Sequence, residues 1–418
     1  MAVATVNYTS GLYQKLLKHI VGEAAVLQNV VVIPQRPRSI YCSTMYRLHL
    51  RYTLENESEE SEEEVEHQEA GAKNRVIKIF VKDVPSAFFS ISKEHILYGE
   101  ILPRINQILH YCGTTRISPK LYYALTQGGS THMLEDLSAI DYVTRPRTIG
   151  YNEDEARFII KRLGEFHGAS YFYTSSHSEI IGKLQRIYQG SLESNNIFLE
   201  EKLVYNIEYA SDIVGSWPGY ECIAMKMRRN TRETFRNKFL PLFDVGAAKF
   251  SVITHGDMWV ENVLLKYDED DGLPEDAKFV DYRNCSYSSP AFDLHNFLIT
   301  SLQLPVLMNH TASLIEDYYS SFYSVLLSIH YPHDRIPTFD CVLSELRRTE
   351  YYSYYLLMYP FAEAMLSEDL AYEKSSSLNN VDSDLLERCR KNIYSNPRVL
   401  ETYKYILKTF EQNHLLDE

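Results

Sequence analysis

The segment THGDMWVENVLL (residues 254–265) places a histidine, two carboxylates, a tryptophan and an asparagine directly before an aliphatic run. That run extends to residue 267 as VLLKY, and a second apolar run, KFV, follows at residues 278–280. The ten residues between them, DEDDGLPEDA, carry the Gly, Pro and acidic side chains that are typical of turns. We therefore predict that the two runs pair as an antiparallel hairpin.

In such a hairpin, the start of the first strand meets the end of the second, so Asn262 lies beside Asp281. An amide oxygen and a carboxylate are hard ligands of the kind that Mg²⁺ prefers. Mg²⁺ usually takes only a few protein ligands and completes its shell with substrate phosphates and water. The sequence therefore predicts a magnesium site at Asn262 and Asp281.

Asp257 precedes Asn262 by five positions, which is the spacing of the protein-kinase catalytic loop H-R-D-x-x-x-x-N. Such an Asp orients an attacking hydroxyl and accepts its proton, while a metal ion neutralises the phosphoryl group. Taken singly, Asp257 could cap a turn and Asp281 could simply end a strand. The spacing and the hairpin together favour phosphoryl transfer, with Asp257, Asn262 and Asp281 as the catalytic residues.

A cation for nucleotide phosphates is predicted at Lys82, in the strand-like run RVIKIFVKDVP (residues 75–85). In the next helical segment, Glu94 falls in line with three apolar residues, Leu97, Tyr98 and Ile101. An unpaired carboxylate in an apolar stripe is costly, so Lys82 is its expected partner, as in the strand-Lys to helix-Glu pair of kinases. The alternative is that Glu94 lies at the edge of the stripe and reaches water.

The N-terminal part of the chain is predicted to be β-rich. Apolar and polar residues alternate within residues 39–54 and 75–85, and KLYYALTQ (residues 120–127) indicates a further strand. We expect an amphipathic helix within residues 1–22 and a helix over residues 86–110 that Pro103 ends or kinks. From residue 152 onward the periodicity predicts mostly helices.

A run of glutamates dominates the charge of the chain. Residues 55–69 contain nine glutamates and no Lys or Arg, and they supply nine of the 14 excess negative charges. Because a like-charged segment cannot bury its side chains, we predict a solvated, disordered hairpin loop over residues 55–74, with an acidic docking segment as the alternative. The mild acidity of the remainder argues against a nucleic-acid-binding surface and a polybasic membrane patch.

Several functional classes are disfavoured. The six cysteines form no CxxC pair, so neither a zinc site nor a disulfide framework is indicated, and a cytoplasmic location is expected. No segment approaches the ~18 apolar residues of a membrane span, and the N-terminus lacks the order of a secretory signal. The chain contains no GxxxxGK[ST], GxGxxG, GxSxG or HExxH string, which disfavours P-loop, dinucleotide-binding and common hydrolase folds.

Together with Lys82 and Glu94, the strings THMLEDL, THGDMWVENVLL, FVDY and SSPAFDLHNFL closely resemble the insect ecdysteroid kinase-like family, also called the CHK kinase-like family. This family is related to choline kinases and aminoglycoside phosphotransferases. The resemblance covers the chain roughly from Ile40 to the last helices. It implies an α+β, bilobed protein-kinase-like fold, with a small β-rich lobe containing one main helix and a larger, mostly helical lobe. The implied activity is ATP-dependent phosphorylation of a small-molecule hydroxyl, on an ecdysteroid or a xenobiotic metabolite.

The resemblance also implies roles for individual residues. Asp257 would be the catalytic base, Asn262 and Asp281 the Mg²⁺ ligands, and Lys82 with Glu94 the phosphate anchor.

Other implied features concern the nucleotide and the lobes. Residues 131–137 would form the hinge that meets adenine, with Glu135 and Leu137 among the nucleotide-binding residues. The nucleotide-binding lobe would comprise residues 1–130 and the catalytic lobe residues 138–418, in a monomer. Asp293 resembles a buried Asp at a helix start that braces the catalytic loop.

The sequence departs from the family pattern at two places. The family commonly has Asp-Phe-Gln where this chain has Asp281-Tyr282-Arg283, and Arg283 either contacts phosphate or is an ordinary surface residue. The loop PRSIYCSTMYR (residues 37–47) contains no glycine. Ser39 and Ser43 are candidates to approach the phosphates there, with less intimate backbone contact than a Gly-rich loop allows.

Two alternatives stay open. A choline or ethanolamine kinase could use the aromatic run EYYSYYLLMYPF (residues 350–361) to bind a quaternary ammonium group, although such a run commonly serves core packing. A nucleotide-binding pseudokinase is the second alternative. The presence of Lys82, Asp257, Asn262 and Asp281 argues against it, whereas Arg283 leaves it open.

Overall fold

The computed structural model describes residues 10–35, 44–55, 74–85, 93–126, 129–230, 232–376 and 383–417 of the chain. The chain divides into two compact units. The first unit comprises residues 1–90, 98–100 and 119–141, and the second comprises residues 91–97, 101–118 and 142–418. The glutamate run and the serines at 39 and 43 lie outside the described residues, apart from Glu55 and Asn74 at the edges of the predicted loop.

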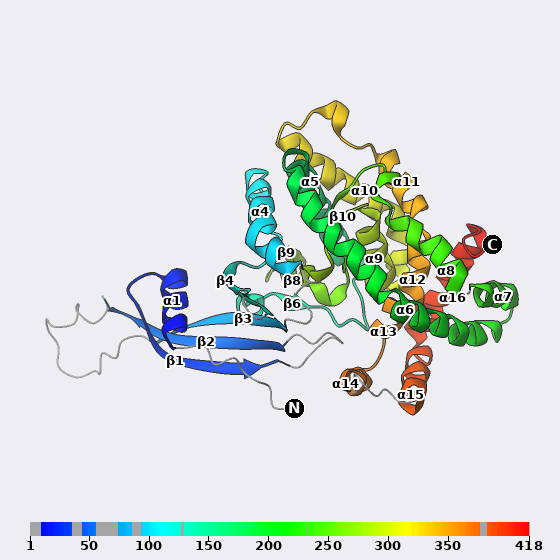
Figure 1. Cartoon of the computed structure of the whole chain (residues 1–418), viewed down its shortest axis with the longest axis horizontal. Helices are drawn as coiled ribbons and strands as arrows, with labels where there is room; N and C mark the ends of the chain where they lie inside the picture. The colour runs from blue at the N-terminus through cyan, green and yellow to red at the C-terminus, as the bar shows by residue number, and fades with distance from the viewer. Residues whose placement is uncertain are drawn as a thin grey trace. The chain divides into compact units, whose positions relative to one another are not determined.

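A five-stranded antiparallel sheet forms the first unit, in the order β1-β2-β3-β5-β4 (Figure 1). Its strands are β1 (Ala25–Pro34), β2 (Thr44–Leu54), β3 (Arg75–Pro85), β4 (Leu121–Leu125) and β5 (Gly129–Glu135). Alternation along β2 buries Tyr46, Leu48 and Leu50, and helix α1 (Ser10–Val21) covers this face with Leu16 and Leu17. The predicted strands and the predicted opening helix are therefore confirmed.

The helical segment between β3 and β4 is interrupted. It consists of α3 (Glu94–Ile96), a π-helical segment (Leu97–Ile101) and α4 (Leu102–Tyr111). Pro103 was predicted either to end or to kink this helix, and an end is excluded, because Pro103 stands in the first turn of α4 and the helix continues for eight more residues. The π-helical segment just before it fits the usual effect of a proline, which lacks the N–H of a regular turn.

Two long helices pack closely at the centre of the second unit (Figure 1). Helix α5 (Glu153–Ser176) begins at a capping box formed by Asn152 and Glu155. It crosses α10 (Leu304–Ser328) at two glycines. A Cβ atom at Gly164 would lie 2.3 Å from a carbonyl oxygen of α10, and one at Gly168 would lie 2.7 Å from another. Only glycine permits this approach.

The second unit contains further helices besides α3, α4, α5 and α10. They are α6 (Ser178–Gly215), α7 (Glu221–Arg229), α8 (Arg232–Phe239), α9 (Ala291–Ser301), α11 (Phe339–Arg348), α12 (Tyr351–Leu356), α13 (Ala362–Ala364), α14 (Glu368–Ser376), α15 (Ser383–Tyr394) and α16 (Pro397–Gln412). The prediction of a mostly helical chain after residue 152 is confirmed. Within the described ranges, no helix combines the length and the apolar character that crossing a membrane requires.

The predicted hairpin is present in the second unit. Strand β8 (Val263–Tyr267) pairs antiparallel with β9 (Pro274–Phe279) and with the short strand β6 (Val143–Thr144). The second strand begins at Pro274 and not at Lys278, so the connection is shorter than expected. The cause is a tight turn in which the Asp268 carboxylate accepts hydrogen bonds from the N–H groups of Asp270 and Asp271.

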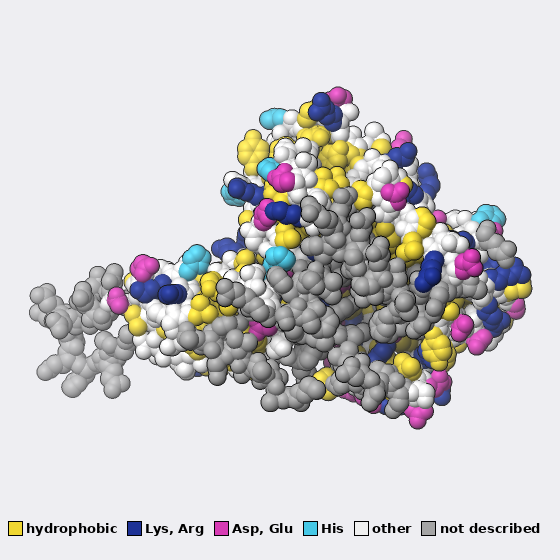
Figure 2. Space-filling model, in the orientation of Figure 1, with side chains coloured by type: hydrophobic (Ala, Val, Ile, Leu, Met, Phe, Trp, Pro, Cys, Tyr) yellow, Lys and Arg dark blue, Asp and Glu magenta, His cyan; other side chains and the backbone are white. Residues whose placement is uncertain are grey.

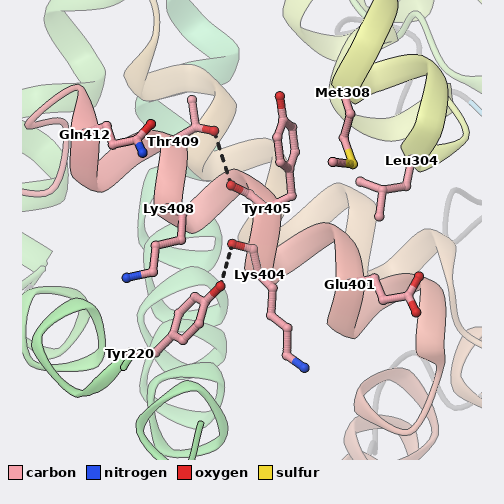
Figure 3. Close-up of a pocket in the computed structure, with 9 residues that line it drawn as sticks. All are labelled: Tyr220, Leu304, Met308, Glu401, Lys404, Tyr405, Lys408, Thr409 and Gln412. Atoms are coloured by element: carbon pink, nitrogen blue, oxygen red, sulfur yellow. Dashed lines mark hydrogen bonds between the residues drawn. The ribbon is translucent and has the colours of Figure 1, made fainter. Parts of the chain in front are cut away.

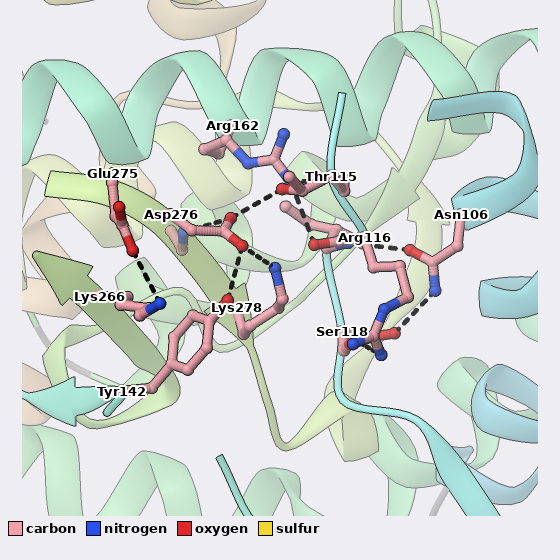
Figure 4. Close-up of polar contacts among 12 residues, drawn as sticks. Asn106, Thr115, Arg116, Ser118, Tyr142, Arg162, Lys266, Glu275, Asp276 and Lys278 are labelled. Carbon is pink, nitrogen blue, oxygen red and sulfur yellow. Dashed lines mark hydrogen bonds and ion pairs between the residues drawn. The ribbon is translucent and has the colours of Figure 1, made fainter. Parts of the chain in front are cut away.

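A buried polar network underlies β9 (Figure 4). Asp276 forms an ion pair with Lys278 and accepts hydrogen bonds from Thr115 Oγ1 at 2.8 Å and Tyr142 Oη at 2.6 Å. Burial alone would raise the pKa of Asp276, but these hydrogen bonds together lower it. Nearby, Arg162 of α5 donates to the backbone oxygen of Thr115 at 2.8 Å. The network thus connects two segments that are distant in the sequence to one strand. One segment ends at residue 118, and the other begins at residue 142.

The described elements confirm the α+β class, with the β-rich part N-terminal and the helical part C-terminal. The predicted Lys82 is on the third strand and a helix follows that strand, which agrees with protein kinases, in which the phosphate-binding Lys is on the third strand. On the face shown in Figure 2, basic and acidic side chains are interspersed over the described surface.

Candidate active site

The segment between β7 and β8, residues 255–262, contains the predicted catalytic residues Asp257 and Asn262, and we call it the catalytic loop. Strand β7 (Val252–Thr254) precedes it and pairs antiparallel with β10 (Ser286–Ser288). A single 3-10 turn, Val260–Asn262, leads from the loop into β8. Both ends of the loop are therefore fixed by strands, which limits the movement of the side chains between them.

Gly256 allows the catalytic loop to approach the turn that follows Asp281. Its φ angle is +80°, in the left-handed region. A Cβ atom at this position would lie 2.1 Å from the backbone oxygen of Asn284. No other residue fits here without displacing one of the two segments.

Asp293, near the start of α9, holds the backbone of the catalytic loop in place through its carboxylate. Its Oδ2 atom accepts a hydrogen bond from the N–H of His255 at 2.5 Å, and its Oδ1 atom accepts one from the N–H of Gly256 at 2.8 Å. His167 of α5 lies 3.1 Å from Oδ2 through Nε2, and its Nδ1 lies 2.8 Å from the Tyr318 hydroxyl. Asp293 is fully buried, so this bracing geometry matches the position that the resemblance implied.

His255 links the catalytic loop to the end of β9. Its Nδ1 accepts a hydrogen bond from the N–H of Asp257 at 3.3 Å, so its Nε2 carries the proton and donates to the oxygen of Val280 at 3.0 Å. Burial lowers the pKa of His255, which is consistent with a neutral ring. The imidazole therefore serves as a fixed spacer between Asp257 and the residue preceding Asp281.

Asn262 lies where the hairpin predicted it. Its backbone oxygen accepts a hydrogen bond from the N–H of Val280 at 3.0 Å, one residue before Asp281. Its side chain donates from Nδ2 to both Oδ2 (3.0 Å) and the backbone oxygen (2.8 Å) of Asp257. Since both of these hydrogen bonds use the nitrogen, the oxygen of the amide is available to a cation.

Arg283 brings a positive charge to the two carboxylates. Its Nη2 atom lies 3.1 Å from Oδ2 of Asp281 and 3.9 Å from Oδ2 of Asp257. Burial raises the pKa of Asp257 to about 6. Arg283 and the hydrogen bond from Asn262 lower it, whereas the negative charge of Asp281 raises it. The structure thus brings all three predicted catalytic side chains into one neighbourhood of the second unit.

The donor set fits a magnesium ion. Asp281 offers a carboxylate and Asn262 an amide oxygen, both hard ligands. The guanidinium of Arg283 already lies against Asp281, which indicates that this position attracts a cation. No cluster of three or more His, Cys, Asp or Glu side chains suited to a metal occurs among the described residues. Mg²⁺ is commonly bound by one or two protein ligands and substrate phosphates, so two donors are compatible with it.

The predicted phosphate anchor is buried as expected. The exposed fraction of Lys82 is 5% and that of Glu94 is 1%. The alternative in which Glu94 reaches water is therefore wrong. The pairing of Lys82 with Glu94 stays a prediction.

The three residues predicted to bind the nucleotide, at positions 43, 135 and 137, lie in different parts of the chain's structure or outside its described residues. Glu135 is the last residue of β5, and its N–H donates to the oxygen of Lys120 at 2.9 Å. Leu137 is buried and begins a 3-10 turn, Leu137–Ile140. Ser43 lies outside the described residues. The hinge at residues 131–137, the boundaries of the two lobes and the contacts of all three residues with a nucleotide stay predictions.

The aromatic run at residues 350–361 serves packing. It forms α12 and a π-helical segment (Leu357–Phe361), and Tyr351 and Tyr354 are buried. Tyr352 lies edge-on to Phe292 with ring centroids 5.0 Å apart, and the ring of Tyr355 stacks on it at 5.5 Å. These rings contact one another, which favours the core-packing interpretation over cation–π binding.

A shallow groove of about 420 Å³ lies elsewhere on the second unit (Figure 3). It is formed by α16, the start of α10 and Tyr220, whose hydroxyl donates to the oxygen of Lys404. None of the three predicted catalytic residues lines it. The groove is therefore not the candidate active site.

His167 was not singled out from the sequence. Its partners, Asp293 and Tyr318, are 126 and 151 positions away, so no local pattern reveals the cluster. The only sequence signal is the placement of His167 directly before a glycine of the crossing with α10.

The match to a family model agrees with the motifs. Residues 38–331 match the Ecdysteroid kinase-like family, whereas a search of curated proteins found no match. A GDP complex of a mutant aminoglycoside 2′-phosphotransferase-IIIa is similar in structure, with a TM-score of 0.39 and 9% identity over 93% of this chain and 97% of that one. The wild-type GDP complex gives a TM-score of 0.35 and 10% identity over 93% and 98%. Because the family match spans well over half of the sequence, this chain belongs to the ecdysteroid kinase-like family and is a phosphotransferase that acts on small-molecule hydroxyls.

Proposed function

We propose that this enzyme transfers the γ-phosphate of ATP, in a Mg²⁺-dependent reaction, to a hydroxyl of an ecdysteroid or a similar steroid or xenobiotic metabolite. The observation that carries the chemistry is the hydrogen-bonded pair of Asp257 and Asn262 beside the end of β9. The family supports the ecdysteroid class of acceptor. We further propose that the enzyme acts as a cytoplasmic monomer.

Asp257 acts as the base in this proposal. Asn262 and Arg283 occupy the side of its Oδ2 atom, which leaves Oδ1 to accept the proton of the acceptor hydroxyl. With a pKa of about 6, the carboxylate of Asp257 is ionised at neutral pH. Its pKa is also close to the working pH, which favours efficient proton transfer. The brace by Asp293 holds the backbone of the loop in place, so the base needs little reorganisation.

Asn262 and Asp281 would hold the metal ion, which supplies positive charge to neutralise the transferring phosphoryl group. Lys82 binds the nucleotide phosphates and Glu94 orients it, as the family pattern implies. Glu135, Leu137 and Ser43 contribute the remaining contacts with the nucleotide. These assignments rest on the family pattern and on the burial of Lys82 and Glu94.

A phosphate-transfer screen over steroids, glycosides and amino alcohols, with mass-spectrometric detection of products, tests the proposal. We expect a phosphorylated steroid with the wild-type enzyme and none with Asp257→Asn. General base catalysis typically contributes a factor of ~10²–10⁴, so the variant should fall below detection. Product formation from choline in preference to steroids would contradict the acceptor class.

Two controls separate the causes of a negative result. Nucleotide binding by Asp257→Asn, measured by calorimetry, should equal that of the wild type, because this residue contacts the acceptor. Asp212→Asn removes one carboxylate from an exposed pair with Arg228 and should leave turnover unchanged. Full activity in Asp257→Asn would remove the assigned base.

A further inference from the structure

We propose that Arg283 competes with the divalent cation for Asp281, so that the free protein carries its own counter-cation in the metal site. This inference rests on the proposed function, because it takes Asp281 as a metal ligand. It concerns Arg283, which follows the Asp281-Tyr282 pair directly.

The guanidinium of Arg283 lies within ion-pair distance of two carboxylates, those of Asp281 and Asp257. One nitrogen, Nη2, lies 3.1 Å from Asp281 and 3.9 Å from Asp257, in each case measured to Oδ2. The exposed fraction of the Arg283 side chain is 15%, and those of Asp281 and Asp257 are 19% and 26%. Partly buried charges at these distances are screened less by salt than surface pairs, so their attraction is not negligible.

The backbone delivers Arg283 to this position. Asp281 has a φ of +67°, in the left-handed region, and the following residues form the 3-10 turn Tyr282–Asn284. Tyr282 is fully buried, with its ring 4.7 Å from that of His255 and 6.2 Å from that of Phe166. Because the buried Tyr282 fixes the turn in the core, Arg283 is held near Asp281.

A metal ion at Asp281 changes this arrangement. The carboxylate oxygen of Asp281 that forms the ion pair with Arg283 is a donor that a divalent cation needs, and two added positive charges repel the guanidinium. Binding of the free metal must therefore break the pair of Arg283 with Asp281. A nucleotide bound together with the metal offers phosphate oxygens to the displaced guanidinium, which forms bidentate contacts readily. The consequence is weak binding of the metal alone and joint binding of metal and nucleotide.

Binding of Mn²⁺ alone tests the competition without nucleotide or acceptor. The electron paramagnetic resonance signal of unbound Mn²⁺ gives the affinity of the wild type, Arg283→Gln and Arg283→Lys. We expect Arg283→Gln to bind Mn²⁺ at least five-fold more tightly than the wild type. Arg283→Lys, which keeps the charge, should bind more weakly than Arg283→Gln. Arg347→Gln, at an exposed position of α11, removes the same charge and should match the wild type.

The location of the metal is tested with Asp281→Asn and with the double variant Asp281→Asn/Arg283→Gln. We expect neither variant to show the tighter Mn²⁺ binding of Arg283→Gln. Equal, weaker or absent binding by Arg283→Gln relative to the wild type overturns the competition, as does retained tight binding in the double variant. Thermal unfolding of each variant shows whether it is folded, and Arg283→Lys provides the comparison if Arg283→Gln is not.

Failure of the proposed function is distinguishable from failure of this inference. A phosphate-transfer screen that yields no product from any acceptor counts against the proposed function, whereas the Mn²⁺ comparison among variants needs neither ATP nor acceptor. Conversely, turnover by the wild type together with unchanged Mn²⁺ affinity in Arg283→Gln preserves the proposed function and refutes the role of Arg283.

Discussion

The Asn262 amide donates two hydrogen bonds to Asp257, one to the carboxylate at 3.0 Å and one to the backbone oxygen at 2.8 Å. A single side chain therefore fixes both the orientation of the proposed base and the backbone of its loop. The five-residue spacing of the two residues is what makes this double contact possible.

Replacing Asn262 with Leu removes both hydrogen bonds and a proposed metal ligand. We expect kcat to fall by at least ~10²-fold, the range associated with misplaced catalytic groups. Because the hydrogen bond from Asn262 lowers the pKa of Asp257, any residual activity should require a higher pH than in the wild type. The pH profile of kcat measures both effects. Asn413→Leu, which alters a surface hydrogen bond to Glu350, is the control.

Asp257 should control the acidic side of the activity profile. Its carboxylate gains a proton as the pH falls through about 6, so kcat/KM should decrease below that value with a slope of one. A profile that stays flat down to pH 5 would contradict the assignment. Binding of the metal lowers this pKa, so the inflection in kcat should lie below that in kcat/KM.

Protonation of Asp257, which should lower activity, should raise the stability of the folded protein. Its folded-state pKa of about 6 exceeds the unfolded value of about 3.9, so protonation favours the folded state. That contribution is fully present below about pH 3.9 and is lost as the pH rises through about 6. Asp257→Asn should therefore exceed the wild type in unfolding free energy by about 1–3 kcal/mol at pH 8, with a smaller difference at pH 4. Urea unfolding at the two pH values provides the measurement.

Gly256→Ala should disrupt the catalytic loop. Its Cβ atom would lie 2.1 Å from the Asn284 oxygen, and neither partner is a flexible side chain. We expect a loss of about 2–4 kcal/mol of unfolding free energy and loss of phosphotransfer. Gly219→Ala is a matched control, because Gly219 has a similar φ of +79° with nothing within 4 Å of its Cβ position. It should lose only about 1 kcal/mol, from backbone strain.

Asp293→Asn should separate bracing from chemistry. The amide oxygen still accepts from one of the two backbone N–H groups, but the NH₂ group faces the other, which is left without an acceptor. We expect kcat to fall by ~10-fold or more while the affinity for ATP is retained, together with a loss of about 2–4 kcal/mol in stability. Unchanged kcat in a destabilised but folded variant would show that the brace does not position the base.

The predicted pair of Lys82 with Glu94 can be measured by a double-mutant cycle on kcat/KM for ATP. Lys82→Met and Glu94→Gln should each reduce kcat/KM, and the double variant should be little worse than Lys82→Met alone, since the two act as a unit. A parallel cycle on the exposed pair of Lys266 with Glu275 should give a coupling near zero. Additive effects at Lys82 and Glu94 would refute the pairing.

The hairpin of β8 and β9 was predictable because two apolar runs flank a segment with clear turn residues. The start of the second strand was not, because Asp268 closes the turn by side-chain hydrogen bonds that strand propensity does not encode. Similarly, the helix after β3 was predicted by its apolar stripe, whereas its π-helical segment depends on local backbone adjustment at Pro103.

The predicted catalytic side chains were identifiable from spacing and the brace Asp293 from the family resemblance, whereas the other supports were not identifiable. Asp257 and Asn262 lie on one loop, so their relation is local in sequence. The contact of Asp293 with His167 joins elements 126 positions apart, and the position of Arg283 depends on a left-handed residue at Asp281. Neither feature has a signature in a single sequence.

The attachment of Thr115 and Tyr142 to Asp276 has an evolutionary consequence (Figure 4). The chain leaves the second unit after residue 118 and returns at residue 142, and both anchor points meet one carboxylate. The intervening segment, residues 119–141, is thus fixed to the second unit at both of its ends. Insertions or deletions within it can change β4 and β5 in related proteins without disturbing the part of the second unit that holds the proposed catalytic residues.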